Sequence, residues 1–119
     1  MDFTFTEDQQ LFQDSVRDFL INEVTPERIR ACWETDSGRD DALWAQLVEL
    51  GLTGMTVPEE HGGLGMSELD FVLLAQECGY VALPEPLVNM VMIAVPMLRE
   101  VGGDLASEWL PKIAAGEAR

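Results

Sequence analysis

Apolar residues recur at helical spacing along nearly the whole chain, and this periodicity constrains the fold more than any other feature of the sequence. The first stripe consists of Phe12, Val16, Phe19 and Leu20. Thr6 and Gln9 precede it at the spacing of a capping box, which predicts the start of a helix. Thr25 followed by Pro26 is typical of an N-cap with proline at the first helical position, so we expect a second, short helix there.

Two further helices are predicted in the middle of the chain. The first covers about 41–50 and ends at Gly51, a natural C-terminal stop. Its expected inner face consists of Leu43, Leu47 and Leu50. Ser67 and Asp70 resemble a capping box with aspartate in the last position, which predicts a helix over 68–78. The inner face of that helix is expected to consist of Phe71, Val72, Ala75 and Cys78.

The last third of the chain is also predicted to be helical. Two prolines open an apolar helix, which Pro96 should kink near its end and the glycine pair 102–103 should stop. Asp104 is expected to cap a last helix that carries Leu105, Trp109 and Ile113. Residues 52–57 are the sole candidate for an extended piece. The predicted fold is all-α, an up-down bundle of about six helices in one domain over residues 1–119.

The charge balance excludes several classes of partner. Acidic residues outnumber basic ones by 22 to 7, giving a formal net charge of −15, and the basic residues are dispersed. Such a field repels nucleic acid, anionic lipid and phosphate-rich ligands. The apolar stretch 87–98 would span roughly 18 Å as a helix, less than the ~30 Å of a bilayer core, so no membrane span is predicted.

The N-terminus and the cysteines bear on location. MDFTFTEDQQ is acidic from its second residue and has no apolar run behind it, so a signal peptide is not expected. Cys32 and Cys78 are the two cysteines, which does not indicate a disulfide framework and favours a cytosolic location. Their apolar neighbours favour inert core thiols over a reactive pair.

The stretch VPEEHGGLGMSELD, residues 57–70, raises the question of a phosphate-binding loop. HGGLGMS is neither GxGxxG nor a P-loop ending in GK[ST], and Glu59 and Glu60 would repel phosphate. A structural turn is therefore favoured over an anion site. In such a turn Gly62 and Gly63 would supply positive φ angles, so replacing either glycine with alanine should destabilise the fold.

No catalytic or metal-binding residue is predicted. His61 is the single histidine, and its neighbouring glutamates would diverge from it on a turn. A helical di-iron site needs Glu-x-x-His, whereas Pro58 stands three residues before His61, so an exposed loop histidine is favoured. No serine or cysteine can be paired with this histidine by spacing. The acidic residues Glu27, Glu34, Asp40 and Asp41 are expected to form a solvated face.

The order of the motifs resembles the N-terminal domain of the acyl-CoA dehydrogenases. The run LWAQLVELGLTGMTVPEEHGGLGMSELDFVLLAQECGY is similar to that family's helix ending in LGL, its vPEeyGGlG turn and the helix that follows. FTEDQQLFQDSVRDFL resembles its first helix, and LREVGGDLASEWLPKIAAGEAR its GteeqkerwLP segment. The similarity covers all 119 residues in order.

The resemblance implies a part of an FAD-dependent oxidoreductase. By the resemblance, the family's middle β domain and C-terminal helical domain would follow Arg119 and are expected to be absent from this chain. In the family they hold the flavin, most CoA contacts and the catalytic glutamate, so this chain alone should be colourless and inactive. The resemblance implies an acyl-CoA substrate, an oligomer and electron-transfer flavoprotein as a partner. This domain would supply one wall of the acyl pocket, with these candidate residues: Leu87, Met90, Val91 and Ala94.

The sequence departs from the family pattern at two places, and one alternative function stays open. The residues PEP at 84–86 do not match members that act on straight-chain acyl groups, and Met90 falls near a position that is polar in some members. The hypothesis is that Met90 limits the depth of the pocket. The alternative is a stand-alone helical interaction module without catalysis, for which an apolar patch around 87–98 and 105–113 would favour self-association. A β-rich continuation of the reading frame past Arg119 would favour the enzyme.

Overall fold

The computed structural model describes residues 2–119, and its regular structure is helical. The α-helices are α1 (Glu7–Glu23), α2 (Pro26–Trp33), α3 (Asp41–Glu49), α4 (Glu68–Tyr80), α5 (Leu87–Asn89), α6 (Val95–Val101) and α7 (Gly103–Ala114). A wide π-helical turn, Met90–Ala94, joins α5 to α6, and a 3₁₀ turn covers Glu59–His61. The helical regular structure confirms the all-α prediction. Because α5 and α6 form one continuous rod, the helices count as six rods. None of the helices within 2–119 combines the length and apolar character needed to cross a membrane.

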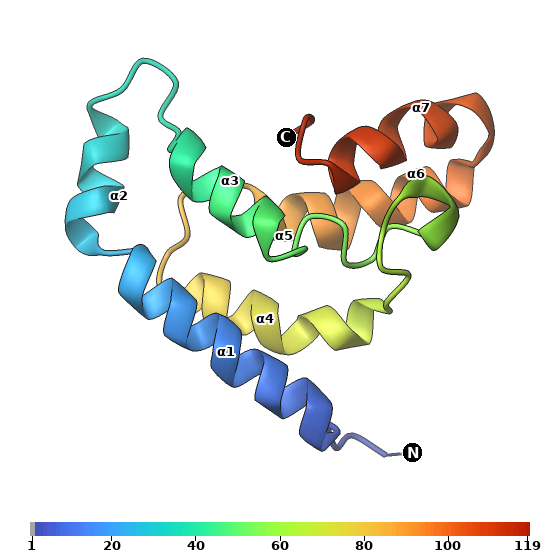
Figure 1. The fold of residues 1–119 in the computed structure, drawn as a ribbon, viewed down its shortest axis with the longest axis horizontal. Helices are drawn as coiled ribbons and strands as arrows, with labels where there is room; N and C mark the ends of the chain where they lie inside the picture. Colours follow the sequence, from blue (N-terminus) through green and yellow to red (C-terminus); the bar gives the residue numbers. More distant parts are fainter. Residues whose placement is uncertain (1) are drawn as a thin grey trace.

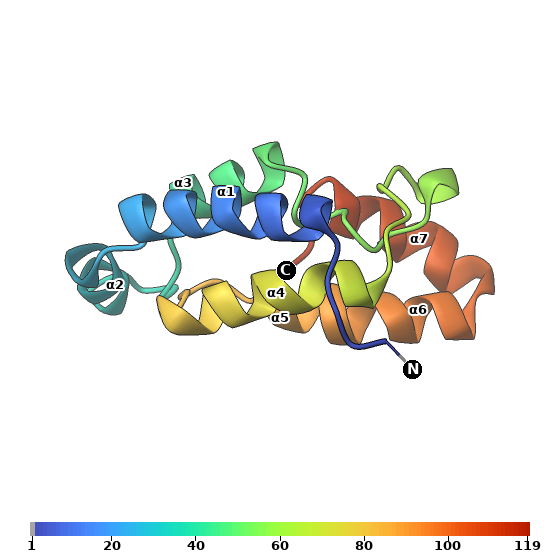
Figure 2. The same ribbon diagram turned by 90° about the horizontal axis from the view of Figure 1, so that it is seen from below.

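The helices form a flat, two-layered arrangement of 40 × 36 × 21 Å. Seen edge-on, α1, α3 and α7 lie in one layer, and α4 lies with the α5–α6 rod in the other (Figure 2). Figure 1 shows α1 and α4 side by side and running in the same direction, whereas α7 folds back along α6. Directions therefore alternate between α6 and α7 but not between α1 and α4.

The helix starts follow the local signals with two exceptions. The capping boxes at Thr6 and Ser67 and the Thr25 cap are all present, as predicted. Asp104 does not cap α7, because the helix already begins at Gly103; its carboxylate lies in the first turn, where the helix dipole favours negative charge. Asp40 is not part of a solvated face, because its carboxylate caps α3 and binds the guanidinium of Arg28.

The segment predicted to be extended, residues 52–57, is a series of turns buried between the two layers. Its backbone is bonded to the chain that returns after the glycine loop: the N–H groups of Leu64 and Met66 donate to Gly54 and Met55, both at 2.9 Å. A buried irregular segment needs such partners, because unpaired backbone groups are costly away from water. Tertiary contacts, not a β-ladder, hold this segment.

The glycine loop is a structural turn, but its two central glycines differ. Gly62 has φ +85°, as predicted. Gly63 does not have a positive φ; a Cβ there would lie 2.0 Å from the carbonyl oxygen of Val57, so this glycine permits a close approach of two backbones. The second left-handed residue is Gly65, with φ +64°. The prediction of a positive φ at Gly63 was therefore wrong.

The core consists of two clusters, and their members differ in part from the predicted faces. The larger cluster lies between α1, α3, α4 and α5, and the smaller one between α6 and α7. Leu50 and Val72 were predicted to face inward but are 44% and 41% exposed, whereas Leu74 is buried. Cys32 and Cys78 are both buried and unpaired, as predicted, and burial raises the pKa of the Cys78 thiol to about 12.

Candidate functional site

An apolar groove of about 510 Å³ runs between α6 and α7. Its lining is almost entirely hydrophobic: Met90, Ala94, Met97, Leu98, Val101, Leu105, Trp109, Ile113 and Ala118, with Arg119 at one end. Four of these side chains stand out into solvent; Met97 and Val101 are 63% and 65% exposed, and Leu105 and Trp109 are 52% and 40% exposed. The groove therefore presents apolar surface that nothing within the described chain covers.

The four residues singled out from the sequence separate into two pairs. Met90 and Ala94 line the groove. Leu87 and Val91 are fully buried in the larger core cluster. The spacing of these residues predicted one shared face, but the two pairs lie on different sides of the rod.

Residues on α7 complete the groove. Leu105 and Trp109 were placed on the last helix by their apolar spacing, but the buried face of α7 consists of Ala106, Leu110 and Ile113. The i, i+4 step from Leu105 to Trp109 gives a second apolar stripe on α7, and this is the signal in the sequence for its role in the groove.

An i to i+5 hydrogen bond defines the wide turn that carries Met90. The N–H of Val95 donates to the carbonyl of Met90, five residues earlier, instead of to that of Val91. Pro96 follows and has no N–H to donate. The predicted kink near the end of the helix is therefore a widened turn before Pro96, and Pro96 itself stands in the first turn of α6.

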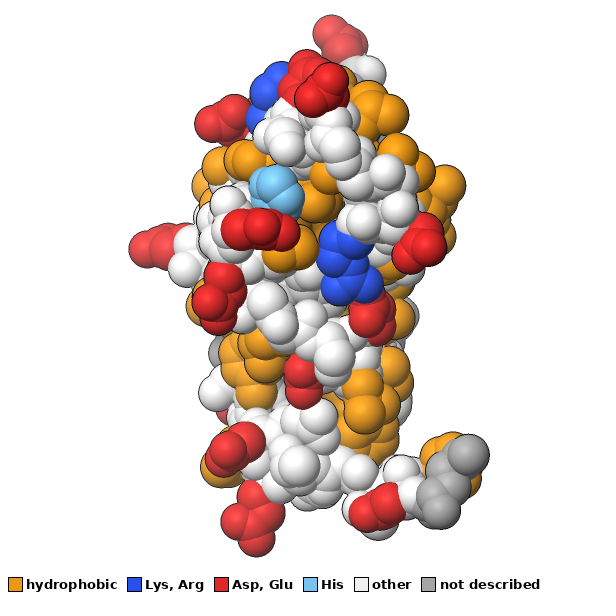
Figure 3. All heavy atoms as spheres, turned by 90° about the vertical axis from the view of Figure 1, so that its right-hand side faces the viewer, with side chains coloured by type: hydrophobic (Ala, Val, Ile, Leu, Met, Phe, Trp, Pro, Cys, Tyr) orange, Lys and Arg blue, Asp and Glu red, His pale blue; other side chains and the backbone are white. Residues whose placement is uncertain are grey.

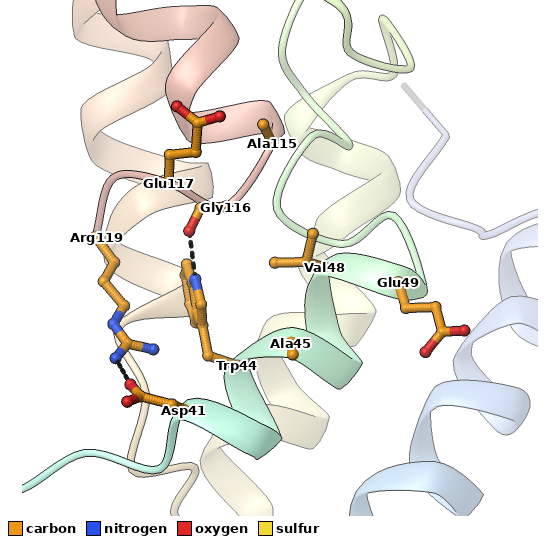
Figure 4. A pocket seen from close by; sticks show the side chains of 9 residues that line it. All are labelled: Asp41, Trp44, Ala45, Val48, Glu49, Ala115, Gly116, Glu117 and Arg119. Atoms are coloured by element: carbon orange, nitrogen blue, oxygen red, sulfur yellow. Dashed lines mark hydrogen bonds and ion pairs between the residues drawn. The ribbon is translucent and has the colours of Figure 1, made fainter.

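A second hollow of about 500 Å³ lies between α3 and the C-terminal tail (Figure 4). The indole N–H of Trp44 donates to the carbonyl of Gly116 at 2.8 Å. The guanidinium of Arg119 lies 5.3 Å from the Trp44 ring centroid and binds Asp41. It also lies 3.6 Å from the fully buried carboxylate of Glu85. These contacts fasten the tail to α3.

The basic side chains are largely neutralised within the fold. Five of the seven lie in ion pairs with carboxylates: Arg17, Arg28, Arg99, Lys112 and Arg119. Figure 3 shows acidic side chains over the face near the α6–α7 turn, with hydrophobic areas between them and little basic surface. This face is unsuited to a polyanion such as the phosphate groups of a nucleotide.

The glycine loop offers no cradle for an anion. Its N–H groups already donate to the loop's own carbonyls: those of His61 and Gly63 to Pro58 and that of Gly62 to Glu59, at 3.0–3.1 Å. An anion site would need such groups free and convergent. The structural-turn interpretation is therefore correct.

Metal and acid–base chemistry find little support in the described residues. Within 2–119 no cluster of three or more His, Cys, Asp or Glu side chains could hold a metal ion. The side chain of His61 is 19% exposed, so the expectation of an exposed loop histidine was wrong; the 3₁₀ turn packs it against α7. The feature that stands out in this geometry is the apolar surface of the groove.

Comparison with known proteins gives a family match over most of the chain. The family model "Acyl-CoA dehydrogenase, N-terminal domain" matches residues 6–117. The acyl-CoA dehydrogenase IpdE2 of Mycobacterium tuberculosis is 29% identical over 94% of this chain and 35% of its own length. The (2S)-methylsuccinyl-CoA dehydrogenase of Cereibacter sphaeroides is 31% identical over 93% of this chain and 20% of its own. The mitochondrial isovaleryl-CoA dehydrogenase of Arabidopsis thaliana is 30% identical over 95% of this chain and 28% of its own length.

The alignments cover most of this chain but a small part of each relative. The chain spans about a third or less of the length of each. No solved structure matches the chain significantly.

Proposed function

Because the chain belongs to the acyl-CoA dehydrogenase family and corresponds to its N-terminal domain, we propose that it forms an apolar wall of the acyl pocket in a flavin-dependent acyl-CoA dehydrogenase. The observation that carries this proposal is the groove between α6 and α7, with uncovered apolar side chains on both helices. Burying a fatty chain against such a surface is favourable by about 25 cal/mol for each Å² removed from water.

The proposed contacts with the acyl chain come from the residues that reach the groove. Met90 and Ala94 are the candidates from the original four, because both line it. Leu87 and Val91 are covered by the core, and we assign them the supporting role of fixing the rod from behind. A methionine at the groove suits an acyl chain, since its flexible thioether adapts to irregular apolar surfaces.

The residues of this chain do not fit a self-contained flavin site. The diphosphate of FAD needs convergent N–H or basic donors, and the glycine loop directs its N–H groups to its own carbonyls. With a net charge of −15, the chain is also a poor partner for the phosphates of CoA. We infer that parts of the enzyme outside residues 1–119 supply the flavin site and the catalytic base. The residues of this chain hold the alkyl group and exclude water from it.

Family membership supports three further parts of the proposal: an acyl-CoA substrate, an oligomeric assembly and electron-transfer flavoprotein as the electron acceptor. The two unpaired cysteines favour a cytosolic location, although relatives named as mitochondrial occur as well. The alternative of a stand-alone interaction module is not favoured, because the family match spans 6–117 and the named relatives are dehydrogenases.

The test uses the methionines as reporters. With ¹³C-methyl methionine, addition of the uncharged thioester S-octanoyl-N-acetylcysteamine should shift the methyl resonances of Met90 and Met97, which line the groove, and leave that of the fully buried Met55 unchanged. Free N-acetylcysteamine serves as the control, because it has the same head group without the alkyl chain. Unchanged Met90 and Met97 signals at saturating thioester, or equal shifts with the free thiol, would contradict the proposed wall.

A further inference from the structure

One carbonyl in the rod that carries the groove has no partner within its own helix. In a regular α-helix the carbonyl of Val91 would accept from the N–H of Val95, which here donates to Met90 instead. In a π-helical turn its donor would be residue 96, which is proline. An unpaired carbonyl at a fully buried position is destabilising, because the group has lost its hydrogen bonds to water.

A side chain from the buried loop supplies the missing donor. The hydroxyl of Thr56 donates to the carbonyl of Val91 at 3.0 Å, and the side chain is 1% exposed. The position of Thr56 is itself fixed, because its own carbonyl accepts from the guanidinium of Arg99 on α6 at 3.3 Å. Thr56 therefore holds the rod at two points, before and after Pro96.

We propose that Thr56 is a positioning residue for the acyl-binding groove: its hydroxyl takes the place of the N–H that Pro96 lacks and so fixes the wide turn bearing Met90 and Ala94. The inference rests on the proposed function for its consequence in binding, but not for its structural part. Without this hydrogen bond the turn has no fixed set of backbone partners, so the two groove residues no longer keep their places relative to α7.

The variants are Thr56→Val, which removes the donor at nearly constant size, and Thr56→Ser, which keeps it. Thr53→Val is the matched control, because the equally buried hydroxyl of Thr53 donates to the carbonyl of Ala114 at 3.1 Å, away from the wide turn. Both valine variants lose one buried hydrogen bond, and the midpoint of thermal unfolding should fall by about 5 °C in each.

Two readouts separate positioning from general stability. In Thr56→Val the ¹³C-methyl resonance of Met90 should move and the amide of Val95 should exchange faster with solvent. In Thr56→Ser and Thr53→Val both should stay as in the parent chain. The uncharged octanoyl thioester should bind severalfold more weakly to Thr56→Val than to Thr53→Val, and Thr56→Ser should restore the affinity.

The outcomes decide the two ideas independently. A folded Thr56→Val variant with unchanged Met90 and Val95 signals overturns the positioning role, whatever the octanoyl thioester does. Absence of a response to the uncharged octanoyl thioester in the parent chain overturns the proposed function, while the Met90 and Val95 signals still decide the role of Thr56. Should Thr56→Val fail to fold, the parent chain decides: a slowly exchanging Thr56 hydroxyl proton close to Val91 is expected, and a freely exchanging one contradicts the proposal.

Discussion

The guanidinium of Arg17 on α1 donates to both carboxylate oxygens of Glu77 on α4, with Nη2–Oε1 at 2.7 Å and Nε–Oε2 at 3.0 Å. Gln13 adds a third donor at 2.8 Å, so the nearly buried carboxylate is fully paired. One helical turn separates Gln13 from Arg17, and this clamp fixes α1 against α4 in a parallel orientation. Apolar packing alone would allow the two helices to slide along each other, whereas a bidentate pair sets their register.

Removal of the Arg17 side chain should destabilise the fold. In Arg17→Met the carboxylate of Glu77 keeps only Gln13 as a donor, and a buried, under-paired carboxylate is costly. The midpoint of thermal unfolding, followed by circular dichroism, should fall by several degrees. Arg39→Met is the control, because Arg39 forms no ion pair within residues 2–119 and its loss should have little effect. Equal midpoints for both variants would show that the clamp contributes nothing.

Acid should unfold the domain through its paired carboxylates. The hydrogen bond from Arg17 lowers the pKa of Glu77, and those from Arg28 and Gln9 lower the pKa values of Asp40 and Asp70. A lowered folded-state pKa contributes stability above the unfolded-state pKa of about 4, and this stability is lost as the pH falls through the folded-state value. Urea midpoints should therefore decrease from pH 5 to pH 3.

The Arg17→Met variant provides the internal check on this pH dependence. Without Arg17, the pKa of Glu77 loses the main cause of its lowering, so protonation of Glu77 destabilises the native state less. The decrease in urea midpoint between pH 5 and pH 3 should be smaller in this variant than in the parent chain. An equal or steeper decrease would mean that the Arg17–Glu77 pair does not contribute to acid unfolding.

The two central loop glycines should respond differently to alanine. Gly62→Ala puts a side chain at φ +85° with free space around it, which costs about 1 kcal/mol. Gly63→Ala brings a Cβ to within 2.0 Å of the Val57 carbonyl oxygen, so the buried loop must move, and the loss should be several times larger. Urea unfolding of both variants measures the difference. Similar losses would argue against a close backbone approach at Gly63.

Substitution of Met90 should change acyl preference. In a complete enzyme that carries this domain, Met90→Gly removes a side chain from the groove and should raise kcat/KM for longer or bulkier acyl groups relative to shorter ones. Met92→Gly is the matched control, because it puts the same glycine into the same wide turn but removes a side chain that does not line the groove. An unchanged substrate profile in Met90→Gly would exclude a role in specificity.

Self-association of the chain should increase with salt. The groove exposes apolar side chains that favour contact, while a net charge of −15 keeps copies apart. Salt screens this repulsion, with a Debye length of about 10 Å at 0.1 M. Light scattering after size exclusion should show a larger mean mass at 1 M than at 0.05 M NaCl, and Leu105→Glu should abolish the increase. Leu64→Glu, at an exposed leucine outside the groove, should not.

The sequence by itself determined the helices and most of their ends. Capping boxes, the Pro26 start and the Gly51 stop depend on residues within one or two helical turns of each other, so they can be read along the chain. The same local logic excluded an anion-binding loop at Gly62. It also marked residues 87–98 as apolar on more than one side, as a rod between a core and a groove requires.

Only the tertiary structure decided which apolar residues reach the groove and which polar groups are buried. Which of the adjacent residues Met90 and Val91 reaches the groove depends on how the rod packs. The paired carboxylate of Glu77 and the hydrogen bond of Thr56 join residues that are 35 to 64 positions apart in the sequence. No local pattern encodes such contacts, because they exist only once the helices have packed. The steric demand at Gly63 likewise comes from Val57, which the chain meets only after it has turned back on itself.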